Sequence, residues 1–229
     1  MSCLSSQTLG YSVIVFRQTV KSRIFCWLTH PILPDHKLAV LARSDDNFFG
    51  LVHSRIHEVW SRAVGTQLRE RESGLNYNVQ SSFETFPFPD QTDEQTQAIA
   101  KAARELNSLR EDWLNPLEWT RVETLDFLGT VGGPWNRYID PATLEDRGTF
   151  KVGTVRYPRL VPRDETCAKR LKDRTLTKLY NERPQWLADC HARLDAAVAA
   201  AYGFPPDFSD EQILSHLLEL NHERKQPAQ

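Results

Sequence analysis

The sequence lacks the features that mark several common classes of protein. Its four cysteines, Cys3, Cys26, Cys167 and Cys190, are scattered without a C-x-x-C pair, which indicates reduced thiols rather than a disulfide scaffold or a zinc site. No apolar run reaches the roughly 18 residues that a membrane-spanning helix needs. The apolar stretch at residues 11–16 is short and follows no basic segment, which disfavours a signal peptide. We therefore expect a soluble, cytoplasmic protein without a membrane contact.

No catalytic or cofactor-binding motif can be assigned. GTVGGPW (residues 129–135) has neither the G-x-G-x-x-G spacing nor the Lys-Ser/Thr of a phosphate loop, and we interpret it as a turn. NPLEW (residues 115–119) begins like the Asn-Pro-Pro-aromatic motif of amino-methyltransferases, but Leu117 replaces the second proline and Glu118 replaces the aromatic residue. No nucleophile motif or nuclease-like carboxylate cluster is evident. We predict no catalytic residue and no bound cofactor in this chain.

One histidine pair has a spacing typical of zinc helices. His53 and His57 lie four residues apart, which can place two imidazoles on one metal ion. The glutamate, Glu58, follows the second histidine instead of the first, and no third ligand is evident nearby. We therefore favour a polar helix face and predict no metal site; an independent metal enzyme built on this pair is the weaker alternative.

The composition is that of an ordinary globular protein with an uneven distribution of charge. The 229 residues are 40% hydrophobic and 25% charged, enough for one large domain or two small ones. The net charge of -2 argues against a uniformly basic nucleic-acid binder. Residues 147–183, however, hold eleven Lys or Arg against four Asp or Glu. This stretch is either a solvated helix face or a strip that contacts phosphates.

The pattern of the first 90 residues indicates a small mixed α/β unit. Strands are predicted where β-branched and aromatic residues gather, at residues 12–16, 23–28 and 37–42. The three- and four-residue spacing that follows predicts one helix, capped by Asp45 or Asp46 and ended by Gly65. VQSSFETFPFP (residues 79–89) is predicted to be a strand whose prolines push its end out of the sheet.

From Thr92 onward the pattern is mainly helical. The capping boxes Thr92/Gln95 and Ser209/Gln212 predict two helix starts. Further helices are predicted at residues 164–180 and, with Pro184 near the first position, at 184–203. Residues 129–162 are expected to be a long irregular loop with short elements. The expected fold is α+β, a small mixed α/β domain at residues 1–90 followed by a mainly α-helical domain at residues 91–229.

Several stretches resemble a known family. In the target-recognition domains of bacterial DNA methyltransferases from restriction–modification systems, an F-G-x-L-x-S-x-x-H-x-x-W helix precedes a loop and an apolar-Pro-apolar-Pro tail. The tail is similar to residues 86–89. The helix motif is matched, with Val52 in place of leucine, by Phe49, Gly50, Ser54, His57 and Trp60. Residues 179–221 resemble the helical C-terminal domain of the MmeI-like enzymes, which carry methyltransferase and recognition domain on one chain.

This resemblance implies that residues 1–90 form a partial target-recognition domain whose core is closed by Phe83 and Phe86. It also implies that the whole enzyme is adenine-specific and uses S-adenosylmethionine. The cofactor loop and catalytic motif of such enzymes are not found in this sequence. We therefore expect a truncated gene, a split subunit or a remnant, without transferase activity unless a separate catalytic subunit supplies it.

Double-stranded DNA is the partner that the resemblance implies. The loop after the motif helix holds candidates for base contacts: Arg69, Arg71, Asn76, Tyr77 and Asn78. The basic stretch holds candidates for phosphate contacts: Lys169, Arg170, Lys172 and Arg174. A solvated loop is the alternative for the first set. The alternative for the whole chain is a protein-interaction module that does not contact DNA.

Overall fold

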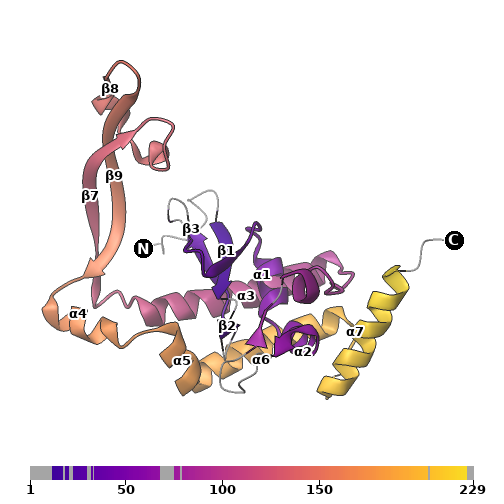
Figure 1. Cartoon of the computed structure of the whole chain (residues 1–229). Coiled ribbons are helices and arrows are strands. Elements are labelled where there is room, and N and C mark those ends of the chain that lie inside the picture. Colours follow the sequence, from indigo (N-terminus) through magenta and orange to yellow (C-terminus); the bar gives the residue numbers. More distant parts are fainter. Residues whose placement is uncertain are drawn as a thin grey trace.

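The protein folds into a helical body with two small sheets and a long β-ribbon that projects from it (Figure 1). The computed structural model describes residues 12–17, 19–20, 23–29, 32, 34–67, 75–77, 79–205 and 207–225. No helix in this described part combines the length and apolar character needed to cross a membrane. The predicted α+β fold class is confirmed by the helices and small antiparallel sheets.

The first part of the chain forms both small sheets of the body. In the first sheet β1 (Ser12–Arg17) lies between β3 (Cys26–Thr29) and β4 (Leu38–Leu41), which confirms the three predicted strands. The second sheet has the order β2-β6-β5, with β2 (Thr19–Val20), β6 (Leu75–Asn76) and β5 (Thr66–Gln67). Both sheets are antiparallel.

The motif helix is divided in two, where the sequence predicts one helix. α1 (Asp46–His53) and α2 (Arg55–Val64) meet at Ser54, whose backbone is extended. The Ser54 hydroxyl accepts the His57 N–H at 3.3 Å and so caps α2; a short polar side chain of this kind competes with helical hydrogen bonding. The predicted ends are confirmed, because Asp45 caps α1 and Gly65 ends α2.

Residues 79–89 do not form the predicted strand. Val79–Phe83 is a π-helical turn, η2, and extended chain follows it. Phe86 is 4% exposed and belongs to the core, and Phe83 and Phe88 pack partly buried against it. The Tyr202 hydroxyl donates to the Pro87 carbonyl at 2.8 Å. The aromatic tail is therefore fixed by packing against the body instead of by strand pairing, and the expected core role of its phenylalanines is confirmed.

The helices after residue 90 form the floor of the body. The two predicted capping boxes are present, Thr92 with Gln95 and Ser209 with Gln212. The first starts α3 (Asp93–Leu114) and the second precedes α7 (Asp210–Lys225). The single helix predicted at residues 164–180 is two short helices, α4 (Glu165–Lys172) and α5 (Leu176–Glu182). The helix that follows them is α6 (Gln185–Ala201).

One continuous hydrophobic core includes residues from both sides of residue 90. Gly50 of α1 marks the closest approach. A Cβ added there would lie 2.7 Å from Ile99 Cγ2 and 3.2 Å from Ala103 Cβ of α3, and 3.1 Å from Leu194 Cδ1 of α6. The absence of a side chain thus lets α1 lie directly on the helical floor.

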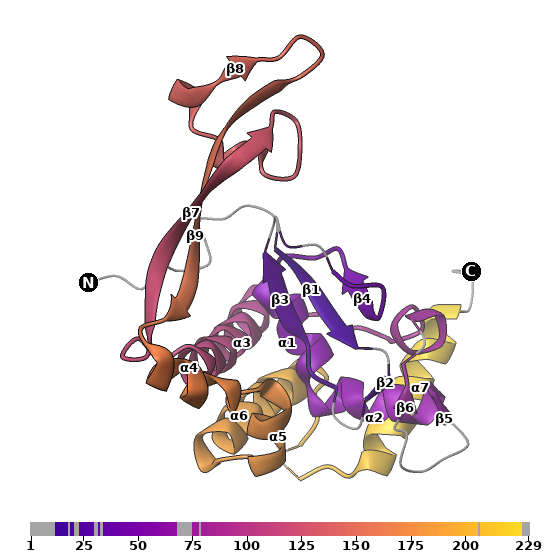
Figure 2. The same ribbon diagram turned by 60° about the vertical axis from the view of Figure 1, so that its left-hand side comes forward.

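A β-ribbon arm replaces the irregular loop predicted at residues 129–162. β7 (Thr120–Thr130) pairs antiparallel with β9 (Lys151–Pro162), and β8 (Glu145–Asp146) adds to the far end of β9. The 3₁₀ turns η3 (Asn136–Tyr138) and η4 (Pro141–Thr143) lie in the connection. Figures 1 and 2 both show the arm extending away from the helices. The C-terminal half is therefore not wholly helical.

Candidate nucleic-acid interface

The paired strands of the arm carry charged side chains on both faces. The strand register places Arg159 opposite Glu123 on one face and Arg156 opposite Asp126 on the other. Arg159 lies 3.7 Å from Glu123, and Arg156 lies 3.2 Å from Asp140. The arginine side chains are 48% and 60% exposed. Exposed ion pairs contribute little stability, so these guanidinium groups are available to another anion.

The far half of the arm is held by a small aromatic cluster of its own. The Trp135 ring packs edge-on against Phe127 and Tyr157, with centroids 5.1 and 5.0 Å apart. A Cβ added at Gly129 would lie 2.4 Å from Val155 Cγ2, so the glycine makes room for that buried valine. An isolated two-stranded ribbon is marginally stable in water. This cluster supplies the packing that the ribbon needs beyond the reach of the body.

Two arginines fasten the root of the arm to the end of α3. Arg163 Nε donates to the Thr120 carbonyl at 2.9 Å, and its Nη2 donates to the Leu117 carbonyl at 3.0 Å. Arg174 Nη1 donates to the Trp113 carbonyl at 2.7 Å. The Arg174 guanidinium also lies 4.8 Å from the Trp113 ring and 4.4 Å from a second indole ring, that of Trp119. These contacts hold the arm in position relative to the body.

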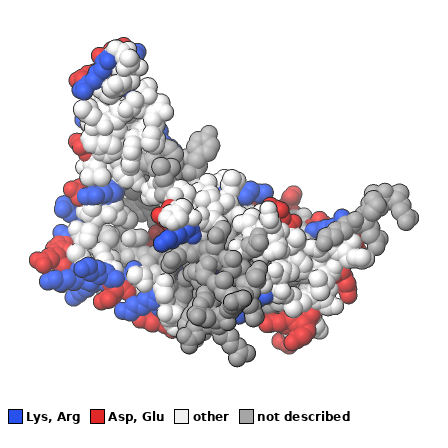
Figure 3. Space-filling view, viewed as in Figure 1, with Lys and Arg blue, Asp and Glu red and all other residues white. Residues whose placement is uncertain are grey.

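The predicted phosphate-contacting set lies on or next to α4, at this root. Lys169, Arg170 and Lys172 are exposed, and Figure 3 shows basic side chains gathered at the α4 corner of the molecule. Lys169 forms only an exposed pair with Glu165, at 3.3 Å. These three residues remain candidates. Arg174 does not, because it is half-buried and its guanidinium is held by the Trp113 carbonyl and lies over two indole rings; we correct its expected role to that of a structural clamp.

Only part of the predicted base-contacting set lies within the described residues. Arg69, Arg71 and Asn78 fall outside the described residues, and Asn76 is described only as backbone, in β6. Figure 2 shows β6 and α4 on different sides of the body. The β6 backbone at Asn76 therefore lies apart from the phosphate-contacting candidates of α4.

Tyr77 is a correction within that set, because it belongs to the core. Its side chain is 1% exposed, and its ring packs 4.8 Å from that of Phe16. Its hydroxyl hydrogen-bonds with His57 Nε2 at 3.1 Å. Burial raises the pKa of the Tyr77 hydroxyl, which keeps it neutral. A side chain enclosed in this way cannot reach a base.

The two motif histidines are buried and serve different hydrogen bonds, which corrects their expected place on a polar helix face. His57 Nδ1 lies 2.8 Å from the Val52 carbonyl, and His53 Nε2 lies 3.2 Å from Arg110 Nη1. Burial lowers the pKa of His57 to about 3 and lowers that of His53 well below its ordinary value. Within the described ranges, no three His, Cys, Asp or Glu side chains are grouped to hold a metal.

The sequence prediction missed the arm: Arg121 was not considered, and Arg156 and Arg159 were considered only as members of the basic stretch at residues 147–183. A signal was present. TRVETLDF (residues 120–127) and VRYPRL (residues 155–160) contain β-branched and aromatic residues, which are enriched in strands. The glycines and prolines around them favoured a loop.

Comparison with known proteins connects this fold to restriction–modification enzymes. No curated protein matches the sequence. The fold is similar to that of a solved structure described as the Type IIL restriction-modification enzyme MmeI in complex with DNA, with a TM-score of 0.59 and 17% sequence identity. The similarity covers 93% of this chain but 21% of that chain. The resemblance predicted from the sequence is confirmed: residues 15–90 match the family model of the MmeI target recognition domain, and the chain shares its fold with a part of MmeI.

Proposed function

We propose that this chain is the DNA-recognition part of a restriction–modification enzyme and that the arm and α4 contact the duplex. The observation that carries the proposal is the exposed two-stranded ribbon, with arginines on both faces and a basic helix at its root. The match of residues 15–90 to a target recognition domain supports the same role from a different part of the chain.

The dimensions of the arm fit a DNA groove. The major groove of B-DNA admits a two-stranded β-ribbon. The eleven residues of β7, at ~3.3 Å each, span about 36 Å, and one turn of B-DNA is about as long. Side chains such as Arg156 and Asp126 offer donors and acceptors to base edges. We propose that the arm reads bases while α4 positions the protein on the backbone.

The loop predicted to contact bases remains part of this proposal without Tyr77, which is buried in the core. Arg69, Arg71, Asn76 and Asn78 stay candidates for base contacts. Lys169, Arg170 and Lys172 stay candidates for phosphate contacts, since lysine and arginine supply the non-specific part of DNA affinity.

Methyl transfer in this proposal belongs to a catalytic domain outside these residues, adenine-specific and dependent on S-adenosylmethionine as the family resemblance implies. The sequence contains no glycine loop for the cofactor and no complete Asn-Pro-Pro-aromatic motif. We expect no S-adenosylmethionine binding by this chain alone. Calorimetric titration with the cofactor tests this expectation, and micromolar affinity would contradict it.

Duplex binding at two salt concentrations tests the DNA-contacting role. R156A is expected to reduce discrimination between duplex sequences by about 1–3 kcal/mol, the range for a true base contact. K172A is expected to weaken binding to every duplex and to lower the salt slope by about one. R224A removes an exposed arginine of α7 and serves as the control that leaves both quantities unchanged. A wild-type chain without salt-dependent binding, alone or with a catalytic subunit, would refute the proposal.

A second candidate function, protein docking, is favoured by apolar residues on one face of the arm. Val122, Leu128 and Leu160 share that face and are 55%, 60% and 51% exposed, and exposed apolar groups of this kind mark contact sites. We propose a methyltransferase catalytic subunit as the partner. V122S/L160S is expected to weaken co-purification with that subunit. Loss of DNA binding with unchanged co-purification would contradict the docking role.

A further inference from the structure

A pocket of about 420 Å³ lies in the body, and none of the described residues that line it belongs to the arm. It is lined from both sides of residue 90, by side chains of the segment before β3, of α1 and α2, and of the region from α5 to α7. The lining residues that determine its charge are Arg23, Arg55, Arg62, Arg183, Glu58, Asp195 and Asp210. His53, His191 and Tyr180 complete its polar lining.

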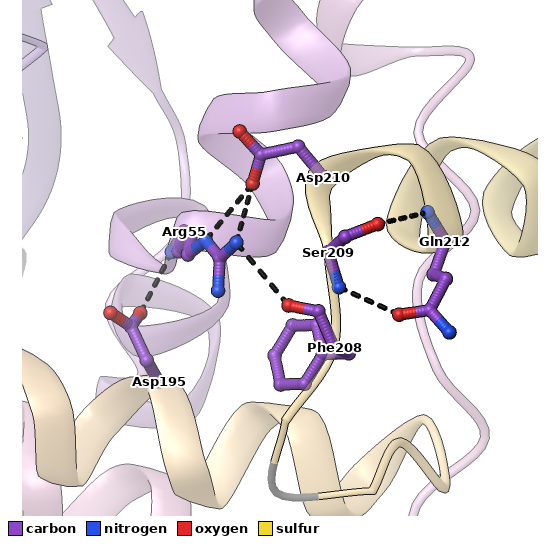
Figure 4. A network of polar contacts seen from close by, with 6 residues as sticks. All are labelled: Arg55, Asp195, Phe208, Ser209, Asp210 and Gln212. Carbon is purple, nitrogen blue, oxygen red and sulfur yellow. Dashed lines mark hydrogen bonds and ion pairs between the residues drawn. The ribbon is translucent and has the colours of Figure 1, made fainter.

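Two of the four arginines are already neutralised. Arg62 pairs with Glu58 along α2. Arg55 Nη2 lies 2.6 Å from Asp210 Oδ1 and also donates to the Phe208 carbonyl at 3.4 Å. Figure 4 shows the Arg55 side chain directed at Asp210 and Phe208, while its backbone N–H donates to Asp195. These pairs build one wall of the pocket, and this wall carries no net charge.

The other two arginines have no carboxylate partner among the described residues. Arg23 lies with its guanidinium 4.6 Å from the centroid of the Tyr77 ring, and its buried Nη1 has no hydrogen-bond partner. Burial lowers the pKa of Arg23. The hydrogen bonds of Arg183 within the described part of the chain come from its backbone, which donates to the Leu179 carbonyl. Two guanidinium groups thus line the pocket without a paired anion.

Arg183 also has a backbone conformation that its residue type disfavours. Its φ of 42° and ψ of 61° are left-handed, and among the described residues it alone has positive φ without being glycine. Glycine is the usual residue at such a helix end. The following residue, Pro184, restricts the conformation further. Backbone strain of this kind clusters at functional sites.

We propose that this pocket binds a phosphate-type oxyanion and that Arg23 and Arg183 are its ligands. A guanidinium group presents two N–H donors in the geometry that phosphate and sulfate accept. The volume accommodates such a group together with part of the molecule that bears it. The oxyanion is either a free ion or nucleotide or a phosphodiester of the DNA backbone, and the experiment separates these sources. The inference rests on the pocket alone and does not require the arm to bind DNA.

Asp195 adjusts the charge of the pocket. Its Oδ1 accepts the Arg55 N–H at 2.8 Å, and burial raises the pKa of its carboxyl to about 6. The charged groups around it are Arg55 and Glu58 of α2 and Arg183 at the end of α5. Nearby His191, whose pKa burial lowers to about 4, stays neutral above that pH. Protonation of Asp195 removes a negative charge from the pocket, so oxyanion binding strengthens as the pH falls through about 6.

Sulfate is the suitable probe, because its charge does not change between pH 5 and 8. The full chain is titrated with sodium sulfate and, at equal ionic strength, with sodium chloride, and the thermal midpoint of unfolding is followed. The wild-type midpoint is expected to rise with sulfate beyond the rise with chloride, and more at pH 5.5 than at pH 7.5. An equal response to both salts would overturn the proposal.

Three variants sharpen the test. R183G is expected to weaken the sulfate response at least tenfold, yet to raise the midpoint without sulfate by roughly 2 °C, because glycine relieves the strain. D195N is expected to strengthen sulfate binding several-fold and to remove its pH dependence. K178A changes an exposed residue of α5 outside the pocket and is the control. A wild-type sulfate response in R183G would refute the role of Arg183.

Duplex DNA distinguishes the two sources of the oxyanion. If the ligand is a backbone phosphodiester, R183G weakens duplex binding and sulfate competes with the duplex. If it is a free ion or nucleotide, R183G loses the sulfate response and keeps the wild-type duplex affinity. R156A lies in the arm and is expected to leave the sulfate response unchanged in both situations. The DNA-contacting role of the arm and the oxyanion site in the pocket can therefore fail independently of each other.

Discussion

The body and the arm of this protein differ in where their apolar side chains lie. In the body, Ile14, Phe49, Leu106 and Leu194 are all 0% exposed and share one core. In the arm, Leu128 is 60% exposed although it lies in a regular strand. Burial of apolar surface is the main stabilising contribution to a fold, so the body carries the stability. The arm instead exposes apolar side chains.

Polar groups differ in the same way. Arg110 in the body is 1% exposed and donates to the Phe25 carbonyl at 2.9 Å, and its Nη1 lies 3.2 Å from His53 Nε2. Arg156 in the arm has only an exposed ion pair. Substitutions in the body should therefore change the free energy of unfolding, whereas substitutions in the arm should change binding.

The largest effect is expected from Arg110, which joins α3 to α1 and to the residue before β3. R110A leaves the buried Phe25 carbonyl without a donor and opens a cavity, which we expect to cost about 3–4 kcal/mol of unfolding free energy. R104A removes an exposed arginine from the same helix, paired with Asp46, and should cost less than about 1 kcal/mol. Urea unfolding measures both. Equal losses in the two variants would refute the assigned role of Arg110.

Acid is expected to destabilise the body through its buried histidines. Burial lowers the pKa of His57 to about 3 and of His191 to about 4, from the ordinary 6.5. Between pH 6.5 and pH 4, the unfolded chain therefore binds protons that the folded chain does not. The contribution of the neutral histidines to the free energy of unfolding is complete above pH 6.5 and is lost as the pH falls toward 4. Asp195 has the opposite effect, because its pKa is raised to about 6. Below that pH its folded form binds one proton that the unfolded form does not, and this offsets part of the loss.

The net result should be a fall in the free energy of unfolding by about 1–3 kcal/mol per pH unit below pH 6. Urea unfolding at pH 7, 6 and 5 measures it. H36Q changes an exposed histidine and should leave the slope unchanged. A free energy that stays constant from pH 7 to pH 5 would show that the buried histidines do not control stability.

A matched pair of glycine substitutions compares the regions directly. In G50A the new Cβ would lie 2.7 Å from Ile99 Cγ2 in the core, and overpacking of this kind should cost about 1–3 kcal/mol of global stability. In G129A the new Cβ would lie 2.4 Å from Val155 Cγ2 in the arm. We expect faster hydrogen exchange in β7 and β9 but a global free energy within about 0.5 kcal/mol of wild type. A global loss in G129A equal to that in G50A would mean that the arm and body unfold together.

The sequence predicted those elements whose signals lie within a few residues. The capping boxes at Thr92 and Ser209 are such signals, because the cap and its partner are three residues apart. Asp45 and Gly65 are local in the same sense. These predictions hold because no distant contact is needed to satisfy the helix ends.

The sequence did not predict features that depend on distant partners. The pairing of Thr120 with Pro162 closes the arm across a long connection, and no local pattern specifies that pairing. Tyr77 is buried by Phe16 and His57, and Arg174 is held by Trp113 and the arm root. From the sequence both residues have the character of a surface loop or helix. The candidate site was therefore only partly predictable: the α4 residues were found, and the arm was not.

Removal of the arm tests the central claim most directly. Residues 121–162 are replaced by a short Gly-Ser linker from Thr120 to Arg163, which the structure permits because Thr120 and Pro162 are paired neighbours. Duplex binding and urea unfolding are then measured on the same preparation. We predict that duplex affinity falls at least tenfold while the free energy of unfolding stays within about 1 kcal/mol of wild type. Duplex affinity within twofold of wild type, in a variant that remains folded, would contradict the assignment of DNA recognition to the arm.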